Sequence, residues 1–187
     1  MLRFAKEEDV DHLIPILFQI FDDMELEVFN KVGREKMMKL IREGFFQSDY
    51  RYGYKNILVE EIEGKIAGLS VGYPEELEDD IDQPMQKIMQ KHGIDSQTLF
   101  DDKEAWPGEW YLDSFAISKD LQNQGIGTKM LKELIEWVKN QGEKTLSLNV
   151  DTKNDRARHV YEKLGFKKVG ELYIGTHLYE HMQLNLI

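Results

Sequence analysis

The chain has 187 residues, 41% hydrophobic residues, no cysteine and a formal net charge of −11. This length suits one domain with a sizeable core, and the lack of cysteine excludes disulfides, a cysteine nucleophile and thiolate zinc sites. No apolar run reaches the ~20 residues that span a bilayer, and the opening MLRFAKEEDVDH turns acidic at once, unlike a secretory signal. We therefore expect a cytoplasmic protein with no membrane partner.

The first 73 residues alternate strand-like and helical patterns. Apolar residues recur at helical spacing from Val10 to Phe21, and Pro15 inside this pattern indicates that the helix is kinked or begins later than Glu8. Glu63-Gly64 between two apolar segments predicts a hairpin. The elements predicted here are strands at 2–5, 56–61 and 65–73 and helices at 10–21 and 34–46.

Residues 74–107 interrupt this regular pattern. They open with PEELEDDIDQP, contain one short helical stretch at 85–91 and end at Trp106-Pro107. A connection of this length is usually functional or disordered. We expect one domain over residues 1–187, in which this acidic insertion at about 74–107 either forms a wall of the binding site or is a solvated excursion.

The remaining residues read as β-α-β-α-β. Gly142 and Gly165 end the two helices, and Asn154 is placed to cap the second. The predicted strands are 110–117, 145–150, 166–170 and 178–186. Hairpin-type connections in the first half and crossovers in the second predict a mixed sheet with helices on both faces, an α+β fold.

The sequence LQNQGIGT at residues 121–128 joins a strand to a helix. Gly125 and Gly127 have no Cβ to keep a ligand from the backbone. The first N–H groups of the helix have no intrahelical partners, and the helix dipole adds partial positive charge there. Such a loop binds phosphate or pyrophosphate, although a tight turn without function has the same pattern.

The spacing of the glycines separates this loop from two better-known phosphate loops. A dinucleotide fold has three glycines as G-x-G-x-x-G, and a Walker loop reads G-x-x-x-x-G-K-[ST]. Gln122-x-x-Gly125-x-Gly127 instead resembles the acyl-CoA pyrophosphate loop of the GNAT N-acetyltransferase superfamily. Downstream, Asn154-x-x-Ala157-x-x-x-Tyr161-x-x-x-Gly165-Phe166 resembles the second cofactor segment of that family, and together the match covers about 111–169.

This resemblance implies the GNAT fold, a mixed and mostly antiparallel twisted sheet whose fourth and fifth strands splay apart around the pantetheine arm of the co-substrate acetyl-CoA. Arg158 would approach the adenosine phosphates and Asn154 the pantetheine. The commonest form of the loop has arginine where Gln122 stands, which implies modestly weaker binding here. The implied cofactor-binding residues are Phe115, Ala116, Ile117, Gln122, Asn123, Gln124, Gly125, Ile126, Gly127, Thr128, Asn154, Arg158 and Tyr161.

The charge distribution agrees with this reading. Residues 115–168 carry 11 Lys/Arg and 7 Asp/Glu, a net +4, which would attract polyanionic CoA. Residues 1–114 carry 13 Lys/Arg and 26 Asp/Glu, a net −13. This negative charge would repel nucleic acid and favour a cationic amine. The acidity alternatively serves only solubility.

Acetyl transfer to an amine needs a base, a donor to the thioester oxyanion and an acid for the leaving thiolate. Tyr161 is the expected acid, because the family often has a tyrosine here whose hydroxyl reaches the CoA sulfur. An ordinary tyrosine pKa of about 10 keeps it protonated; the alternative is a core aromatic. A backbone N–H near residues 115–117 is the expected oxyanion donor.

The base is expected on the strand before the loop, where the family often has an acidic residue. Asp113 is the first candidate and Glu109 the second. Either could instead bind the charge of the substrate or pair with a lysine. Alternation along a strand predicts one face with Glu109, Tyr111, Asp113 and Phe115 and the other with Trp110, Leu112, Ser114 and Ala116.

The histidines do not predict a metal site. His177 and His181 are four residues apart in a strand-like segment, which separates them by roughly 13 Å. We therefore expect no metal.

The resemblance implies an acetyl-CoA-dependent N-acetyltransferase that acts in a ternary complex on a small-molecule primary amine, such as a cationic amine or polyamine. A protein N-terminus or lysine is the alternative acceptor. An acyl-CoA-binding sensor without turnover would carry the same loop, whereas the glycine count disfavours a dinucleotide-binding oxidoreductase. The sequence leaves open whether the protein is a homodimer.

Overall fold

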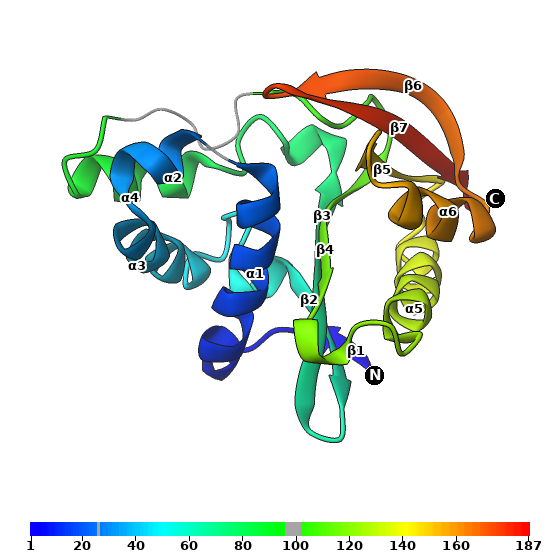
Figure 1. Cartoon of the computed structure of the whole chain (residues 1–187), viewed down its shortest axis with the longest axis horizontal. Helices are drawn as coiled ribbons and strands as arrows, with labels where there is room; N and C mark the ends of the chain where they lie inside the picture. The colour runs from blue at the N-terminus through cyan, green and yellow to red at the C-terminus, as the bar shows by residue number, and fades with distance from the viewer. Residues whose placement is uncertain (26, 96–101) are drawn as a thin grey trace.

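A computed structural model describes residues 1–25, 27–95 and 102–187. Its centre is a seven-stranded sheet in the order β1-β2-β3-β4-β5-β7-β6 (Figure 1). In the part of the chain described, the strands pair antiparallel except β4 with β5, which pair parallel. The strands are β1 (Leu2–Phe4), β2 (Ile57–Ile62), β3 (Lys65–Pro74), β4 (Trp110–Ile117), β5 (Thr145–Asp151), β6 (Lys167–Ile174) and β7 (His177–Asn185).

Helices cover both faces of this sheet. Figure 1 shows α1 to α4 on one face and α5 and α6 on the other, which confirms the predicted α+β fold. The helices are α1 (Val10–Met24), α2 (Glu27–Val32), α3 (Arg34–Phe45), α4 (Gln83–Lys91), α5 (Ile126–Asn140) and α6 (Asp155–Lys163). None of these helices, as far as the described residues extend, has both the length and the apolar content that crossing a membrane requires.

The helix that contains Pro15 begins before the proline and continues through it. A 3₁₀ turn at Glu7–Asp9 precedes α1, so the helix starts at Val10, later than Glu8 as predicted. Pro15 lies in the second turn on the exposed side, while Leu13 and Leu17 are buried on the other. The proline therefore removes one helical hydrogen bond at the solvent side without disturbing the packed side.

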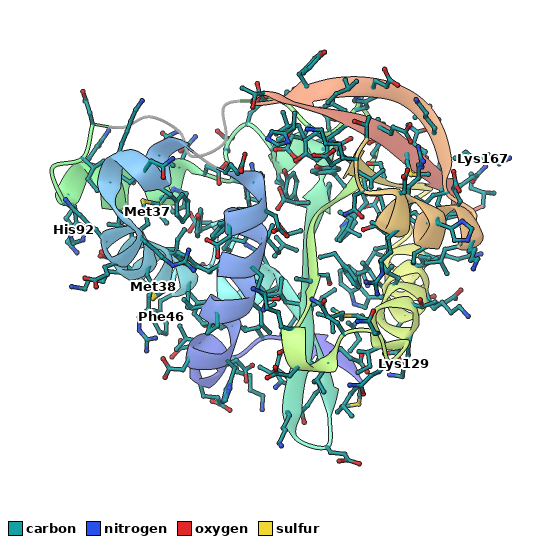
Figure 2. All side chains as sticks on the ribbon, viewed as in Figure 1. Met37, Met38, Phe46, His92, Lys129 and Lys167 are labelled. Atoms are coloured by element: carbon teal, nitrogen blue, oxygen red, sulfur yellow. The ribbon has the colours of Figure 1, made fainter. Side chains whose placement is uncertain are left out.

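The two larger apolar cores formed by the described residues lie on the two faces of the sheet. One is formed by α1, α3, α4, β2 and β3, and the other by α5, β4, β5 and β7. Met37 and Met38 on α3 show how a helix divides between core and solvent, because Met37 is fully buried and Met38 is exposed (Figure 2). On α4, Met85 and Met89 are buried in the first core, so this part of the 74–107 segment is packed against the fold.

The predicted elements agree with those observed, apart from α2, which was not predicted, and the length of β6. This strand continues to Ile174 rather than ending at Gly170. A Cβ at Gly170 would lie 2.5 Å from the Trp106 ring. Gly170 therefore gives room for a packed indole inside the strand and does not end it.

A β-bulge in β4 changes which side chains share a face. Val71 pairs with Ser114 and Gly72 pairs with Leu112, so Asp113 has no counterpart on β3. Beyond the bulge the alternation is inverted. Leu112 and Phe115 both pack in the core with α5, so the prediction that Phe115 shares a face with Asp113 was wrong.

Candidate functional site

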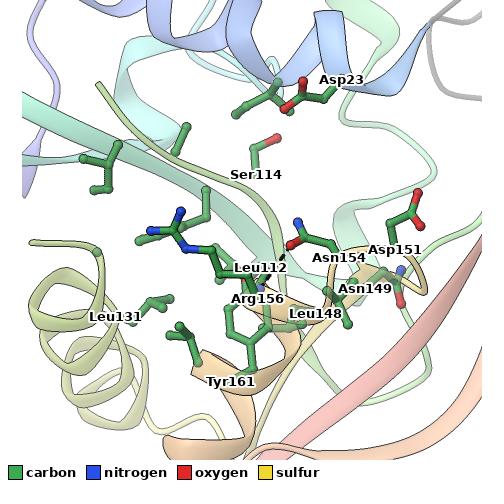
Figure 3. Close-up of a pocket in the computed structure, with 18 of the residues that line it drawn as sticks. Asp23, Leu112, Ser114, Leu131, Leu148, Asn149, Asp151, Asn154, Arg156 and Tyr161 are labelled. Carbon is green, nitrogen blue, oxygen red and sulfur yellow. Dashed lines mark hydrogen bonds between the residues drawn. The ribbon is translucent and has the colours of Figure 1, made fainter. Parts of the chain in front are cut away.

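A cavity of about 730 Å³ opens between the diverging ends of β4 and β5. Its walls come from α1, β4, the glycine loop, β5 and α6. Figure 3 shows Arg156 and Tyr161 on the α6 side and Asp23 of α1 on the opposite side. The cavity thus reaches from the loop at the start of α5 to a region near the end of α1.

The divergence of β4 and β5 leaves backbone groups of β4 facing the cavity. The two strands pair from Trp110 to Leu112 only. The Ser118 N–H donates to the Ala67 carbonyl at 2.8 Å, and the ladder continues in the same register to Ser114. Because paired and unpaired residues alternate in an antiparallel ladder, the N–H groups of Phe115 and Ile117 point away from β3, toward the opening.

The glycine loop leads directly into α5. Gly125 is the N-cap residue at φ 78°, a left-handed conformation that favours glycine. A Cβ at Gly127 would lie 3.4 Å from Ile117 Cγ1, so the first turn of α5 rests on the end of β4. The first N–H groups of α5 therefore lie beside the end of β4 that faces the cavity.

Most residues predicted from the sequence do meet at this cavity. Gln124, Ile126, Glu109 and Arg158 are not among its lining residues. The predicted residues that line it are Asp113, Phe115, Ala116, Ile117, Gln122, Asn123, Gly125, Gly127, Thr128, Asn154 and Tyr161.

Tyr161 lies at the floor of the cavity on α6. Its ring packs edge-on against Phe166, with 5.8 Å between centroids. Burial raises the pKa of the Tyr161 hydroxyl to about 12, which keeps the group protonated at neutral pH. Tyr161 is therefore a packed aromatic residue of the cavity wall whose hydroxyl stays protonated.

Three polar residues of the second segment have different surroundings. The Asn154 side chain accepts a hydrogen bond from the Ala157 N–H at 3.1 Å, so it caps α6 as predicted. Arg156 lines the cavity and donates to the Asn123 side chain. Arg158 instead pairs with Asp155 and Glu180. The arginine beside the glycine loop is thus Arg156.

Asp113 is buried in an ion pair. Arg51 donates to one oxygen of its carboxylate, and the hydroxyls of Ser114, at 2.7 Å, and Tyr52, at 3.2 Å, donate to the other. Arg51 also donates to Asp82 at 2.8 Å. Asp113 therefore links β4 to the loop after α3 and to the 74–107 segment.

Glu109 belongs to a hydrogen-bond network within the sheet. His181 Nε2 lies 3.0 Å from its carboxylate, and Gln183 and the Trp106 N–H donate to it as well. Burial alone would raise the pKa of Glu109, but the hydrogen bonds, led by that of His181, outweigh it and hold the pKa below the usual value.

No sequence motif marks the far end of the cavity. Three carboxylates line it there, those of Asp23, Glu104 and Asp151, and Asn149 and Tyr179 lie beside them. Burial, with a contribution from Asp113, raises the pKa of Glu104 to about 8. These residues come from α1, from the segment before β4 and from β5, so only the fold brings them together.

The histidines of β7 behave as strand residues. His177 contacts Asp151, and His181 is fully buried beneath Trp106, whose ring stacks on it at 4.2 Å between centroids. Across the residues that the structure covers, no three His, Asp or Glu side chains gather as a metal site would require.

Comparison with known proteins relates this site to a family. A sequence model of the acetyltransferase (GNAT) family matches residues 18–166. A crystal structure of an acetyltransferase is 40% identical over all of both chains with a TM-score of 0.88. An N-acetyltransferase structure from Staphylococcus aureus Mu50 is 28% identical, over 98% of this chain and 100% of that one, with a TM-score of 0.86.

The curated relatives match over shorter stretches. N-alpha-acetyltransferase 30 of Schizosaccharomyces pombe is 35% identical over 34% of this chain and 42% of its own length. A probable spermine N(1)-acetyltransferase of Bacillus subtilis subsp. natto is 36% identical over 38% of this chain and 47% of its own length. The matched segments thus span less than half of each of these relatives.

Proposed function

Because the chain belongs to the acetyltransferase (GNAT) family, we propose that it transfers an acetyl group from acetyl-CoA to a primary amine in a ternary complex. The observation that carries this proposal is the single cavity that joins the glycine loop at the start of α5 to the open edge of β4. A loop with free first-turn N–H groups suits a pyrophosphate, and an open strand edge suits the amides of a pantetheine arm.

The roles in CoA binding follow from these two features. The N–H groups of residues 123–128 hold the pyrophosphate. The backbone groups of Phe115 and Ile117 pair with the pantetheine, because those of Ala116 face β3. An N–H near the same three residues binds the thioester oxyanion. The Asn154 side-chain amide has its NH₂ group left for the pantetheine, because its oxygen caps α6. Tyr161 protonates the leaving thiolate.

The acceptor is a small cationic amine or polyamine. This proposal is supported by the carboxylates at the far end of the cavity, Asp23, Glu104 and Asp151. Several negatively charged side chains in one cleft attract and concentrate a cation. One relative is named a probable spermine N(1)-acetyltransferase, which agrees with this class. We further propose a cytoplasmic location and leave the number of subunits to experiment.

A protein N-terminus is the second candidate acceptor. Relatives named N-alpha-acetyltransferase 30 and [Ribosomal protein bS18]-alanine N-acetyltransferase of Escherichia coli support it. An acyl-CoA sensor without turnover is the alternative outside enzymes. The three possibilities differ in which molecule, if any, makes the protein release CoA.

A thiol-release assay separates them. Acetyl-CoA is incubated with spermine, with a simple monoamine and with a peptide that begins with alanine. We expect CoA release with spermine above the rate without acceptor, because two or more positive charges suit the acidic end of the cavity. Faster release with the peptide would favour protein acetylation, and tight CoA binding without release by any of the three would favour the sensor.

Arg156 is expected to strengthen CoA binding modestly. Replacing Arg156 with Gln should weaken CoA binding by about two- to fivefold at low salt, because an exposed charge pair contributes up to about 1 kcal/mol and is screened by ions. Arg158→Gln should have a smaller effect, since Arg158 is held by Asp155 and Glu180. Calorimetric titration with CoA at low and high salt measures the affinity of both variants. A larger loss of affinity in Arg158→Gln than in Arg156→Gln would contradict the assignment of Arg156 to CoA binding.

A further inference from the structure

Glu104 stands out among the carboxylates of the cavity. It lines the cavity, yet the residue is only 4% exposed. The Tyr111 hydroxyl donates to its Oε2 atom at 2.5 Å. Its other carboxyl oxygen, Oε1, accepts no hydrogen bond from any residue that the structure describes. Among the described residues, Glu104 thus lines the cavity with one carboxyl oxygen that has no hydrogen-bond donor.

The two carboxylates predicted as bases do not offer such an oxygen. Both oxygens of Asp113 accept hydrogen bonds, one from Arg51 and the other from the Tyr52 and Ser114 hydroxyls. Glu109 accepts from the His181 ring on both oxygens and does not line the cavity. A carboxylate whose lone pairs are already used cannot take a proton without losing a bond.

A hydrogen-bond network holds Glu104 in place. The Asn149 side-chain NH₂ group donates to the Glu104 carbonyl and to the Tyr111 hydroxyl, each at 3.1 Å. The Asn149 oxygen then faces His181 Nδ1 at 2.6 Å, and His181 Nε2 faces Glu109. The network therefore fixes the direction in which Tyr111 donates, toward Glu104.

The backbone of Glu104 is fixed as well. The N–H groups of Glu104 and Ala105 both donate to one oxygen of Glu78, at 2.7 Å and 3.1 Å. Glu78 and Glu104 both belong to the 74–107 segment. This segment thus places one carboxylate in the cavity and uses another to hold it there.

We infer that Glu104 is the general base of the acetyl transfer, the catalytic residue whose Oε1 atom takes a proton from the ammonium group of the acceptor. This inference rests on the proposed function, because it assumes that an amine occupies the far end of the cavity. Asp113 and Glu109 are then positioning residues, the first through Arg51 and the second through His181 and Asn149.

The reaction balances with the groups present. An N–H bond of the ammonium breaks and its proton passes to Oε1 of Glu104. The freed lone pair attacks the thioester carbon, the C–N bond forms, and the C–S bond breaks with its electron pair on sulfur. The second proton on nitrogen reaches the sulfur through the Tyr161 hydroxyl, and Glu104 releases the first proton to water.

The surroundings of Glu104 suit a base that acts near neutral pH. Burial and the charge of Asp113 raise its pKa, Arg51 and the Tyr111 hydrogen bond oppose the rise, and the resulting pKa is about 8. An effective general base has a pKa near the working pH. The charged and titratable groups that face it are Asp113, Arg51, Tyr111, Glu78, Tyr73 and Tyr179.

The test replaces Glu104 with Gln, which keeps the shape and can still accept from Tyr111. With acetyl-CoA and spermine, kcat/KM should fall about 100-fold or more, while the CoA dissociation constant stays within twofold of wild type. The wild-type kcat/KM should rise through about pH 8, because the carboxylate is the active form, and this rise should be absent in Glu104→Gln. The matched control is Glu76→Gln, an exposed residue of the same segment, with wild-type kinetics.

A second variant tests the positioning. Tyr111→Phe removes a hydrogen bond that lowers the pKa of Glu104, so the rise in kcat/KM should move to higher pH. An NMR titration of carbon-13-labelled glutamate carboxyl groups measures the pKa directly, independently of catalytic turnover. It should show one carboxyl group that titrates near pH 8 and that disappears in Glu104→Gln.

The outcomes separate the two proposals. No CoA release by the wild-type protein would count against the proposed function and leave the titration to decide whether Glu104 is poised as a base. A folded Glu104→Gln protein with wild-type kcat/KM and an unchanged pH profile would overturn the inference. So would a titration in which no glutamate responds near pH 8, whatever the turnover.

Discussion

Replacing Gly127 with Asp is expected to weaken CoA binding by roughly 100-fold or more, because two unit charges at contact distance repel by about 4 kcal/mol in a partly solvated site. Gly127 is the second residue of α5, and the first turn of that helix carries no acidic residue. The negative charge of an Asp at this position would interact favourably with the dipole of α5 and stabilise the helix. The folded protein should therefore keep its stability while it loses its ligand.

Gly127→Asn is the matched control, since Asn has the shape of Asp without the charge. Both side chains place a Cβ 3.4 Å from Ile117 Cγ1, so any steric cost is shared. Calorimetric titration with CoA should give a much smaller loss for Asn than for Asp, and thermal unfolding should give similar Tm values. Equal losses for the two variants would mean that the loop does not hold an anion.

Replacing Tyr161 with Phe is expected to lower kcat by about 100-fold or more, the usual effect of removing a general acid. The ring would still pack against Phe166, so the fold and the affinity for CoA should change little. With a pKa of about 12, the wild-type hydroxyl remains the acid form throughout the neutral range and loses its proton only as the pH rises through that value. The wild-type rate should therefore show no alkaline decline from Tyr161 near neutral pH.

The control for this variant is Tyr173→Phe, which removes the same hydroxyl from an exposed position on β6. Steady-state kinetics with acetyl-CoA and spermine, together with CoA titration, measure rate and affinity separately. A loss of affinity in Tyr161→Phe without a loss of kcat would assign Tyr161 to packing alone. If Tyr161→Phe kept the wild-type kcat, Tyr161 would not be the general acid.

Local sequence patterns predicted most elements of this fold, although not α2. Glu63 and Gly64 have φ values of 50° and 76° in the β2–β3 turn, as the hairpin signal implies. Gly142 and Gly165 follow α5 and α6 at φ 90° and 97°. Each of these signals depends on residues close together in the chain, which is why composition and spacing reveal them.

The bulge at Asp113 could not be predicted in the same way. It depends on how β3 and β4 pair, with Val71 opposite Ser114 and Gly72 opposite Leu112. Nothing in the sequence of β4 alone marks the extra residue. As a result the assignment of faces was wrong from Ser114 onward, and the backbone N–H groups that face the cavity could be identified only in the structure.

The acidic end of the cavity depends on contacts still farther apart in the chain. Arg51 reaches Asp113 across 62 positions, and Asn149 reaches Glu104 across 45. No spacing rule connects such pairs. The glycine loop, by contrast, consists of eight consecutive residues, so its place at the start of α5 could be predicted from the sequence.

The most direct test of this account is a crystal structure of the protein grown with CoA. We predict that the diphosphate lies on the N–H groups of residues 125–128 and that the pantetheine runs along Phe115–Ile117 between β4 and β5, with its sulfur at Tyr161. A diphosphate bound elsewhere, or a pantetheine outside the opening between these strands, would contradict the account.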